Sequence, residues 1–163
     1  MLKTLAASLF FLSALIGPAH AQGDPVYEFS ESDPGMSAAI SKARATLDTF
    51  LDKTMQNGQS GPQTMLKVAI PTSTVDEVIW ITPFVQRPGA EWMGILANQP
   101  HFIEGANAGD AVTFTTEQIA DWAIFDAKGV MYGGYTIREM VASGAVTPDM
   151  VPTMSADPVP AAW

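Results

Sequence analysis

Two short stretches of this sequence place a carboxylate close to an indole, a combination that can hold a ligand. Asp121 directly precedes Trp122, and Glu77 lies three residues before Trp80. A carboxylate accepts hydrogen bonds and an indole offers a flat apolar surface, so either pair can contribute to a binding site. A protonated Glu77 beside Asp121 would also supply an acid and a base, which is the basis of an enzymatic alternative.

Both pairs also have an ordinary structural explanation, which we favour. Large aromatic residues such as Trp122 usually belong to a core. Asp121 would then cap a short helix or bond Arg138. On an extended strand Glu77 lies on the face opposite Trp80, and an outward-facing glutamate is usually only solvated.

Asn98 and Arg138 complete the set of candidates. Asn98 would join Glu77 and Asp121 in a closed pocket. Arg138 can clamp a ligand carboxylate through two parallel hydrogen bonds, although an internal bridge to Asp121 or Glu77 is its more ordinary use. No residue is predicted to be catalytic. The candidate binding residues are Glu77, Trp80, Asn98, Asp121, Trp122 and Arg138.

The sequence predicts neither a metal site nor a cofactor. Cysteine is absent, and His101 is the single histidine left once a leader is removed. Zinc sites need three or four protein ligands, so this residue set does not favour one. The Gly133-Gly134 pair lacks the lysine and the spacing of a phosphate loop, and we expect a tight turn there before a helix.

The charge of the chain limits its partners. It has 163 residues, with 8 Lys and Arg against 17 Asp and Glu and a formal charge of −9. Nucleic acids and anionic membrane surfaces both reward positive charge, so neither is an expected partner. The leading hypothesis is a non-enzymatic binding or interaction module for an unknown protein or small molecule. A protective partner of a secreted toxin is a further alternative.

Residues 1–21 have the pattern of a secretory signal peptide. Lys3 provides the positive start, Leu5 to Ile16 form a short apolar region, and Ala19-His20-Ala21 matches a cleavage site. Twelve apolar residues are too few for a membrane-spanning helix, which needs about 20. We therefore expect cleavage after Ala21, no stable membrane anchor afterwards, and a periplasmic or secreted protein.

The remaining chain predicts a single α+β domain over residues 22–142. Ser32-Asp33-Pro34 is a helix start, and an apolar stripe with steps of three and four follows as far as Asn57-Gly58. Short β-prone runs separated by turns then predict a curved antiparallel sheet of about five or six strands, with the long helix packed on one face.

Pro83 implies a bulge or an edge within its strand. A short helix beginning at a capping pattern, Thr136 to Glu139, is expected to end near Ala142. Residues 143–163 are proline-rich and are expected to be disordered.

A series of motifs resembles one bacterial protein family. Over roughly Val26 to Val141, the motifs are similar to those of the DUF2314 family, also called YegJ-like. The resemblance implies a family of unknown function and supplies no catalytic residues. Many relatives have histidine after the glutamate of the Glu-x-x-Trp motif, where this chain has Val78. The matching segments are Asp33–Met36, Ala39–Leu47, Glu77–Trp80, Gly94–Asn98, Gly109–Thr113, Ile119–Trp122 and Tyr132–Arg138.

Overall fold

The computed structural model describes residues 33–73, 75–89 and 91–163 of the chain. The predicted signal peptide and the extended lead-in around Val26, Tyr27 and Phe29 lie outside the described residues. None of the helices in the described part of the chain is long and apolar enough to cross a membrane. The expectations for residues 1–32 therefore stay predictions.

The long N-terminal helix α1 (Pro34–Thr54) begins where the sequence predicts. The Asp33 carboxylate accepts hydrogen bonds from the amides of Gly35 at 2.8 Å and Met36 at 3.1 Å. It thereby satisfies amides of the first turn that have no partner within the helix. One face of α1 is buried, as the apolar stripe indicates, and comprises Met36, Ala39, Ala43, Leu47, Phe50 and Thr54.

The end of α1 differs from the expectation. The helix stops at Thr54. A short hairpin follows, in which β1 (Met55–Gln56) and β2 (Gln59–Ser60) are joined by a two-residue turn. Asn57 and Gly58 have φ values of 53° and 76° and form the turn of this hairpin rather than the helix cap. The same Asn-Gly pair suits both uses, because a tight hairpin turn also needs positive φ at its two central residues.

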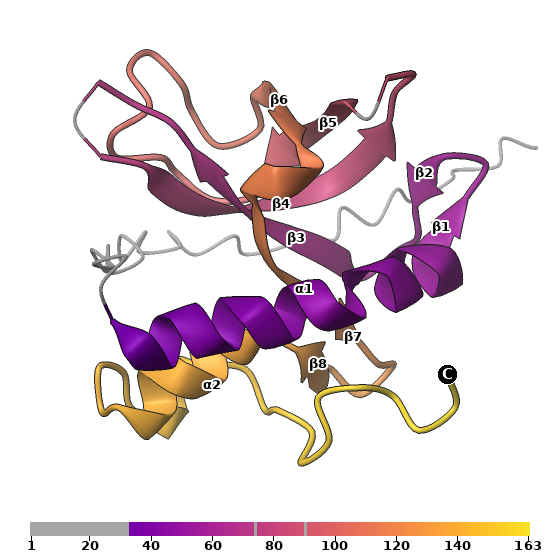
Figure 1. Ribbon diagram of the computed structural model, residues 1–163, viewed down its shortest axis with the longest axis vertical. Helices are drawn as coiled ribbons and strands as arrows, with labels where there is room; N and C mark the ends of the chain where they lie inside the picture. Colours follow the sequence, from indigo (N-terminus) through magenta and orange to yellow (C-terminus); the bar gives the residue numbers. More distant parts are fainter. Residues whose placement is uncertain (1–32, 74, 90) are drawn as a thin grey trace, which may run out of the picture.

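The sheet is antiparallel and strongly curved, and it confirms the α+β class (Figure 1). Among the described residues it has eight strands, in the order β1-β2-β4-β3-β7-β8, with β5 paired to β4 and β6 paired to β5. The count exceeds five or six because β1, β2 and β8 are very short. The remaining strands are β3 (Thr64–Ile70), β4 (Glu77–Gln86), β5 (Glu91–Leu96), β6 (Ala111–Thr115), β7 (Ile119–Phe125) and β8 (Met131–Gly133).

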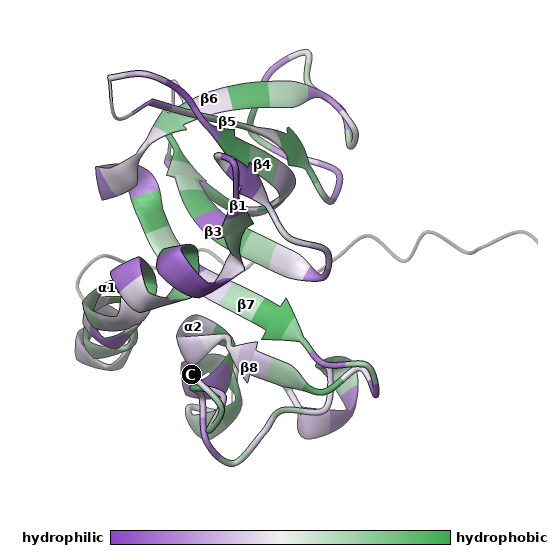
Figure 2. Cartoon of the chain, turned by 90° about the vertical axis from the view of Figure 1, so that its right-hand side faces the viewer, coloured by the Kyte–Doolittle hydropathy of each residue, from purple (hydrophilic) through white to green (hydrophobic). Residues whose placement is uncertain are grey.

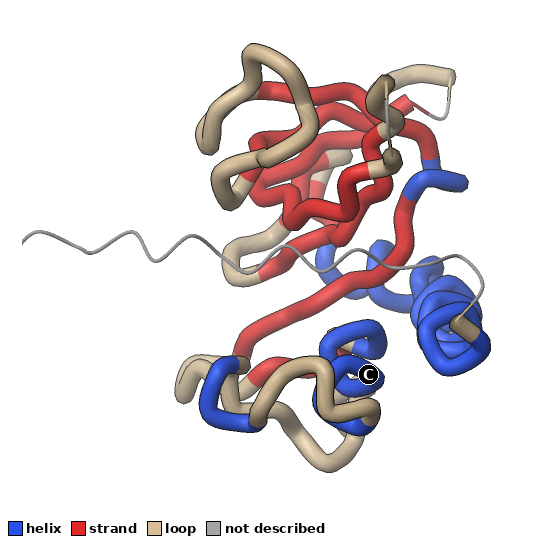
Figure 3. Tube along the Cα trace, turned by 90° about the vertical axis from the view of Figure 1, so that its left-hand side faces the viewer, coloured by secondary structure: helices blue, strands red, loops and turns tan. Residues whose placement is uncertain are grey.

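Strand β7 connects the two parts of the molecule. It runs from the sheet down to the part that contains β8 and the C-terminal helix α2 (Tyr135–Ala142) (Figure 3). The one-turn helix η1 (Thr116–Gln118) precedes it, and the Gln118 side chain accepts from the Thr115 amide at 2.8 Å, as the capping pattern predicts. Pro83 lies at a register shift between β4 and β5, which confirms the predicted bulge.

The main core lies between α1 and one face of the sheet. Phe50 of α1 stacks on Trp122 of β7 with ring centroids 4.8 Å apart, and Leu47 is also buried there. The hydropathy colouring shows apolar segments along the strands of the sheet (Figure 2). Leu66 and Ile81 are fully buried on this face, so the predicted packing of helix on sheet is confirmed.

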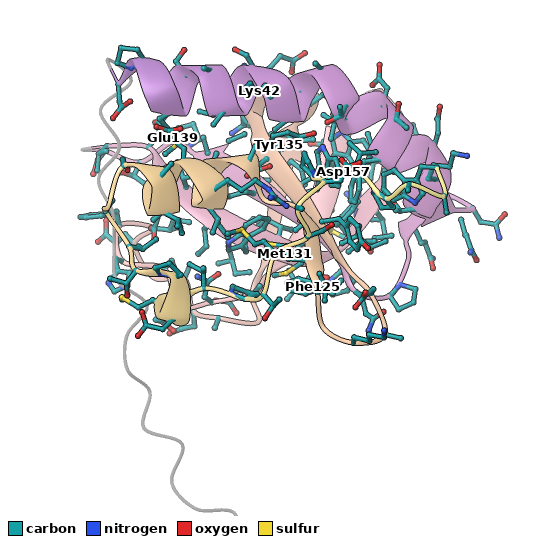
Figure 4. All side chains as sticks on the ribbon, turned by 90° about the horizontal axis from the view of Figure 1, so that it is seen from below. Lys42, Phe125, Met131, Tyr135, Glu139 and Asp157 are labelled. Carbon is teal, nitrogen blue, oxygen red and sulfur yellow. The ribbon has the colours of Figure 1, made fainter. Side chains whose placement is uncertain are left out.

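Helix α2 starts two residues earlier than the capping pattern suggests. Its N-cap is Gly134 in the left-handed conformation, with φ of 60°, and no side chain caps it. Thr136 is therefore inside the first turn rather than at the cap. Tyr135 at the start of α2 lies against α1, where its hydroxyl meets that of Thr46 at 3.3 Å (Figure 4).

Residues 143–163 pack on the domain, which corrects the expectation of a disordered tail. After the short helix η2 (Pro148–Met150), Met154 forms a parallel bridge with Met131 of β8. The Met131 amide donates to the Thr153 carbonyl at 2.8 Å, and the Ser155 amide donates to the Met131 carbonyl at 2.9 Å. Trp163 then stacks on Trp122 with centroids 5.7 Å apart. Prolines disfavour a long helix or a central strand here but allow one helical turn and an extended segment that pairs at a sheet edge.

Candidate functional site

A row of three polar or aromatic residues crosses the face of the sheet opposite α1. Lys67 in the middle of β3 pairs in register with Trp80 on β4 and with Asp121 on β7. Residues paired in register on adjacent antiparallel strands point to the same face, so the three side chains are immediate neighbours. The Lys67 ammonium lies 5.6 Å from the centroid of the Trp80 ring.

Thr136 at the start of α2 joins Lys67 to Asp121. The Lys67 Nζ donates to the Thr136 hydroxyl at 3.2 Å, and that hydroxyl donates to Asp121 Oδ2 at 2.7 Å. The Thr136 amide donates to the same oxygen at 2.7 Å, while Oδ1 accepts from the Trp122 amide at 2.8 Å. Asp121 is fully buried. Its carboxyl group thus lies at the N-terminus of α2, where amides without a partner in the helix favour negative charge.

Burial favours the neutral forms of both charged residues in the row. It lowers the pKa of Lys67 to about 8, and the nearby Asp121 offsets part of that effect. It also raises the pKa of Asp121, against the hydrogen bonds from Thr136 and Trp122 and the charge of Lys67. With a pKa of about 8, part of the Lys67 amine is neutral near physiological pH.

Lys67 and Trp80 lie in the wall of a groove of about 390 Å³. One side is the β3–β4 face, and the other is α2 with the segment Met150 to Pro152 that follows it. Phe125 and Met131, which are labelled in Figure 4, both line the groove. Four methionines line it, together with several other apolar side chains and a few polar ones. The lining residues include Met65, Lys67, Asp76, Glu77, Trp80, Asn98, His101, Phe102, Phe125, Met131, Met140 and Met150.

Glu77 is buried, which corrects the expectation of a solvated side chain. Its carboxylate accepts three backbone amides, from His101 at 2.7 Å, Phe102 at 2.8 Å and Ile103 at 3.1 Å. These bonds fix the loop after β5 at the rim of the groove. Glu77 is therefore an anchor for the wall rather than a free acid or base.

Glu77 and Asp121 do not form the acid–base pair of the enzymatic alternative. They belong to β4 and β7, and β3 lies between those strands. Along β3, Glu77 is level with Ile70 whereas Asp121 is level with Lys67. Three residues of extended chain span about 10 Å, and two strand spacings add a further separation of about 10 Å across the sheet. The partner of Asp121 is instead Lys67.

The other candidates divide between the groove and the interior. Asn98 lines the groove. Trp122 belongs to the core, where its indole N–H donates to the Ala43 carbonyl at 3.2 Å and the Thr46 hydroxyl at 3.0 Å. Arg138 donates to the carbonyls of Gly133 and Ser155, each at 2.8 Å. These bonds tie α2 to the segment after it, which differs from the expected bridge to Asp121 or Glu77.

Lys67 and Thr136 are the members of the site that sequence reasoning missed. The available signal for Lys67 was its position: it is the single charged residue within the apolar run Met65 to Ile70. Alternation predicts a polar face for such a residue, but the face is covered by α2. Among the described residues no group of three His, Asp or Glu side chains could hold a metal ion.

The sequence of this domain matches a known bacterial family. Residues 33–147 match the family model described as an uncharacterized protein conserved in bacteria, DUF2314. The chain belongs to the DUF2314 family. It is also 27% identical over 108 residues to the uncharacterized protein YegJ of Escherichia coli strain K12, covering 66% of this chain and 68% of that protein. No solved structure shows a significant match.

The DUF2314 match includes the whole Trp80–Lys67–Asp121 row and Thr136. The segment Met150 to Pro152, which forms part of the opposite wall of the groove, lies beyond the matched residues. The site therefore combines elements of the DUF2314 domain with a wall contributed by the residues that follow it.

Proposed function

We propose that this chain is an exported binding module that holds a small, mainly apolar ligand in the groove above Lys67. The observation that supports this most directly is the groove itself, which has apolar walls and the polar row at one side. Small-molecule sites combine these two features, because apolar walls provide affinity and a few polar groups fix orientation. The groove volume of about 390 Å³ is in the range of such sites.

The methionines favour a ligand of variable shape. Met65, Met131, Met140 and Met150 all line the groove. Methionine is unbranched and polarizable, so a surface rich in it can adapt to different apolar partners. Trp80 adds a flat aromatic surface beside them.

Charge restricts the ligand further. The acidic side chains Asp76 and Glu77 line the groove against the one ammonium of Lys67. Asp121 lies directly beside that ammonium, and the whole chain carries a formal charge of −9. An anionic ligand would meet net repulsion, so the ligand is uncharged or cationic.

A matched series of probes tests the binding proposal. The probes are 3-phenylpropanol, 3-phenylpropylamine and 3-phenylpropionate, which share one apolar body and differ in charge. Methyl NMR with labelled methionine should show shifts at Met65, Met131, Met140 and Met150. Met55 and Met93 lie outside the groove and serve as internal controls. The alcohol and the amine should bind more tightly than the carboxylate.

Two results would overturn the binding proposal. One is the absence of shifts at the groove methionines with all three probes at millimolar concentration. The other is an equal response at Met55 and Met93, which would indicate nonspecific contact. Tightest binding by the carboxylate would overturn the argument from charge alone.

Export is supported by the Lys3 start, the apolar region and the Ala19-His20-Ala21 pattern. The test is fractionation of a Gram-negative host that expresses the full chain, followed by N-terminal sequencing. Recovery from the periplasm or medium with Gln22 as the first residue is the expected result. A chain that stays in the cytoplasm with residues 1–21 intact would refute this part of the proposal.

A further inference from the structure

We propose that the Lys67 amine forms a reversible imine with an aldehyde or ketone group of a ligand bound in the groove. This inference rests on the proposed function and names the chemical class of the ligand. In the proposed function Lys67 only helps to orient a non-covalently bound ligand. Here its side chain also forms a covalent bond to the ligand.

The position of the amine carries the inference. Lys67 is 6% exposed, and it lines the groove with its ammonium beside the Trp80 ring. The other lysines in the described part of the chain, Lys42, Lys53 and Lys128, are all exposed on the surface. A carbonyl compound in the groove would therefore meet one amine, and that amine is held in place by Thr136 at 3.2 Å.

The charges beside Lys67 favour a carbonyl over a carboxylate. Asp121 faces the amine from the adjacent strand, so a carboxylate ligand would be repelled by it. A carbonyl is uncharged and reacts with the neutral amine. Burial lowers the pKa of Lys67 to about 8. At pH 7 roughly a tenth of the amine is then neutral, against less than about a thousandth for an ordinary lysine.

The reaction needs no oxidant, reductant or second substrate. The nitrogen lone pair attacks the carbonyl carbon, a C–N bond forms, and the carbonyl oxygen takes a proton to give a carbinolamine. A second proton then converts the hydroxyl to a leaving water molecule as the C–O bond breaks. The nitrogen loses its remaining protons and an imine remains, with one water released per ligand bound. Hydrolysis reverses both steps.

Thr136 and Asp121 are positioned to move these protons. The Thr136 hydroxyl accepts from Lys67 and donates to Asp121, so it connects the amine to a carboxyl group. Burial raises the pKa of Asp121, which makes that carboxyl a better proton carrier. The other titratable groups around the site are Asp76, Glu77 and His101 in the groove wall and Arg138 on α2 near Asp121.

Reductive trapping with 3-phenylpropanal tests the inference on the full chain. Sodium cyanoborohydride converts the imine to a stable secondary amine, which peptide mass spectrometry assigns to a residue. At pH 7, Lys67 should be labelled at least roughly tenfold faster than Lys42, Lys53 and Lys128, because more of its amine is neutral. Its labelling rate should rise with pH and level off above about 8.

Three controls separate imine formation from exposure and from folding. An excess of 3-phenylpropanol should protect Lys67 and leave Lys42 unaffected. Lys67→Arg keeps a cation but removes the nucleophile, so the groove should still bind the alcohol without being labelled. Thr136→Val should slow the labelling several-fold, and Thr136→Ser should restore it, because serine keeps the hydroxyl that joins Lys67 to Asp121.

The outcomes distinguish this inference from the proposed function. Groove binding of the alcohol with Lys67 labelled no faster than the exposed lysines would overturn the imine and leave the binding module intact. No binding of the alcohol and no labelling would overturn both. Selective labelling of Lys67 that the alcohol blocks would support both together.

Discussion

Lys67 and Asp121 lie opposite each other on β3 and β7, and the hydroxyl of Thr136 is hydrogen-bonded to both. This relationship connects the sheet to the first turn of α2 through buried polar groups. Such a network stabilises one arrangement of the elements only while every member keeps its partners. It is both the centre of the proposed site and the joint between the sheet and the part of the molecule below it.

Asp121→Ala should destabilise the domain strongly. The substitution leaves the amides of Trp122 and Thr136 and the Thr136 hydroxyl without their buried acceptor, and it removes the negative charge beside the Lys67 ammonium. Loss of one member of a buried charged pair costs about 3–5 kcal/mol. Urea denaturation followed by tryptophan fluorescence measures the effect. Asp48→Ala on the exposed face of α1 is the control, and a similar small change in both variants would contradict the assigned role of Asp121.

The lowered pKa of Lys67 predicts a pH dependence of stability. Between a folded pKa of about 8 and the ordinary value of 10.5, the unfolded chain binds more protons than the folded chain. The free energy of unfolding contributed by this group therefore increases as pH rises through that interval, by an amount on the order of 3 kcal/mol. Below about pH 8 the ammonium is protonated in both states, so burying it lowers the free energy of unfolding by an amount that no longer changes with pH.

Lys67→Met isolates this contribution. Both proteins contain the same tyrosines and surface lysines, so contributions from these residues cancel in the difference between wild type and variant. Urea denaturation from pH 7.5 to 10.5 should show the wild type gaining stability relative to the variant. A difference that stays flat across the interval would mean that Lys67 keeps an ordinary pKa.

Gly133→Ala should cost more than Gly129→Ala, although both glycines have positive φ, 72° and 77°. A methyl group at position 133 would collide with the backbone carbonyl and the ring of Trp122, whereas position 129 has open space. The Gly129 variant should lose about 1–2 kcal/mol from backbone strain alone. The Gly133 variant should lose clearly more, measured by urea denaturation. Equal losses would show that Trp122 can move aside.

Trp163→Ala should destabilise the domain even though this residue lies in a proline-rich segment. Its ring stacks on Trp122 at 5.7 Å and also contacts Phe50 at 6.2 Å between centroids. Losing those contacts should cost about 1–3 kcal/mol in the free energy of unfolding. Trp163→Phe is the matched control and should recover much of the loss. An unchanged thermal midpoint in the alanine variant would mean that this segment does not dock in solution.

The sequence predicts the local elements well and their contacts poorly. Neighbouring residues encode the Asp33 cap, the apolar stripe on α1 and the strands around Leu66 and Ile81. A periodicity of apolar residues of about 3.6 for the helix and two for the strands therefore reveals these elements. The Glu77 anchor and the Lys67–Thr136–Asp121 network join residues far apart in the chain. Nothing local distinguishes a glutamate that is solvated from one that binds three distant amides. Of the six candidate binding residues predicted from the sequence, Glu77, Trp80 and Asn98 line the groove.

The docked segment after residue 142 shows the same limit. Its proline content disfavours a long helix and suggests disorder, but composition contains no information on whether an extended segment finds a free sheet edge. The outer edge of β8 at Met131 provides that edge, and Trp163 provides the apolar contact. Because Met150 and Val151 line the groove, this segment also determines part of the ligand site.

Glu77→Gln should loosen the loop at the rim of the groove while leaving most of the domain intact. The amide has one acceptor oxygen instead of two, and its NH₂ group opposes the backbone amides of His101, Phe102 and Ile103. Loss of hydrogen bonds to a buried charged acceptor costs about 1–3 kcal/mol. Native-state hydrogen exchange should therefore accelerate at these three amides, with little change in the amides that pair β3 with β7. Asp76→Asn is the control, since this neighbouring side chain is exposed. Uniform acceleration across the sheet in the Glu77 variant would mean that Glu77 supports the whole fold rather than the rim.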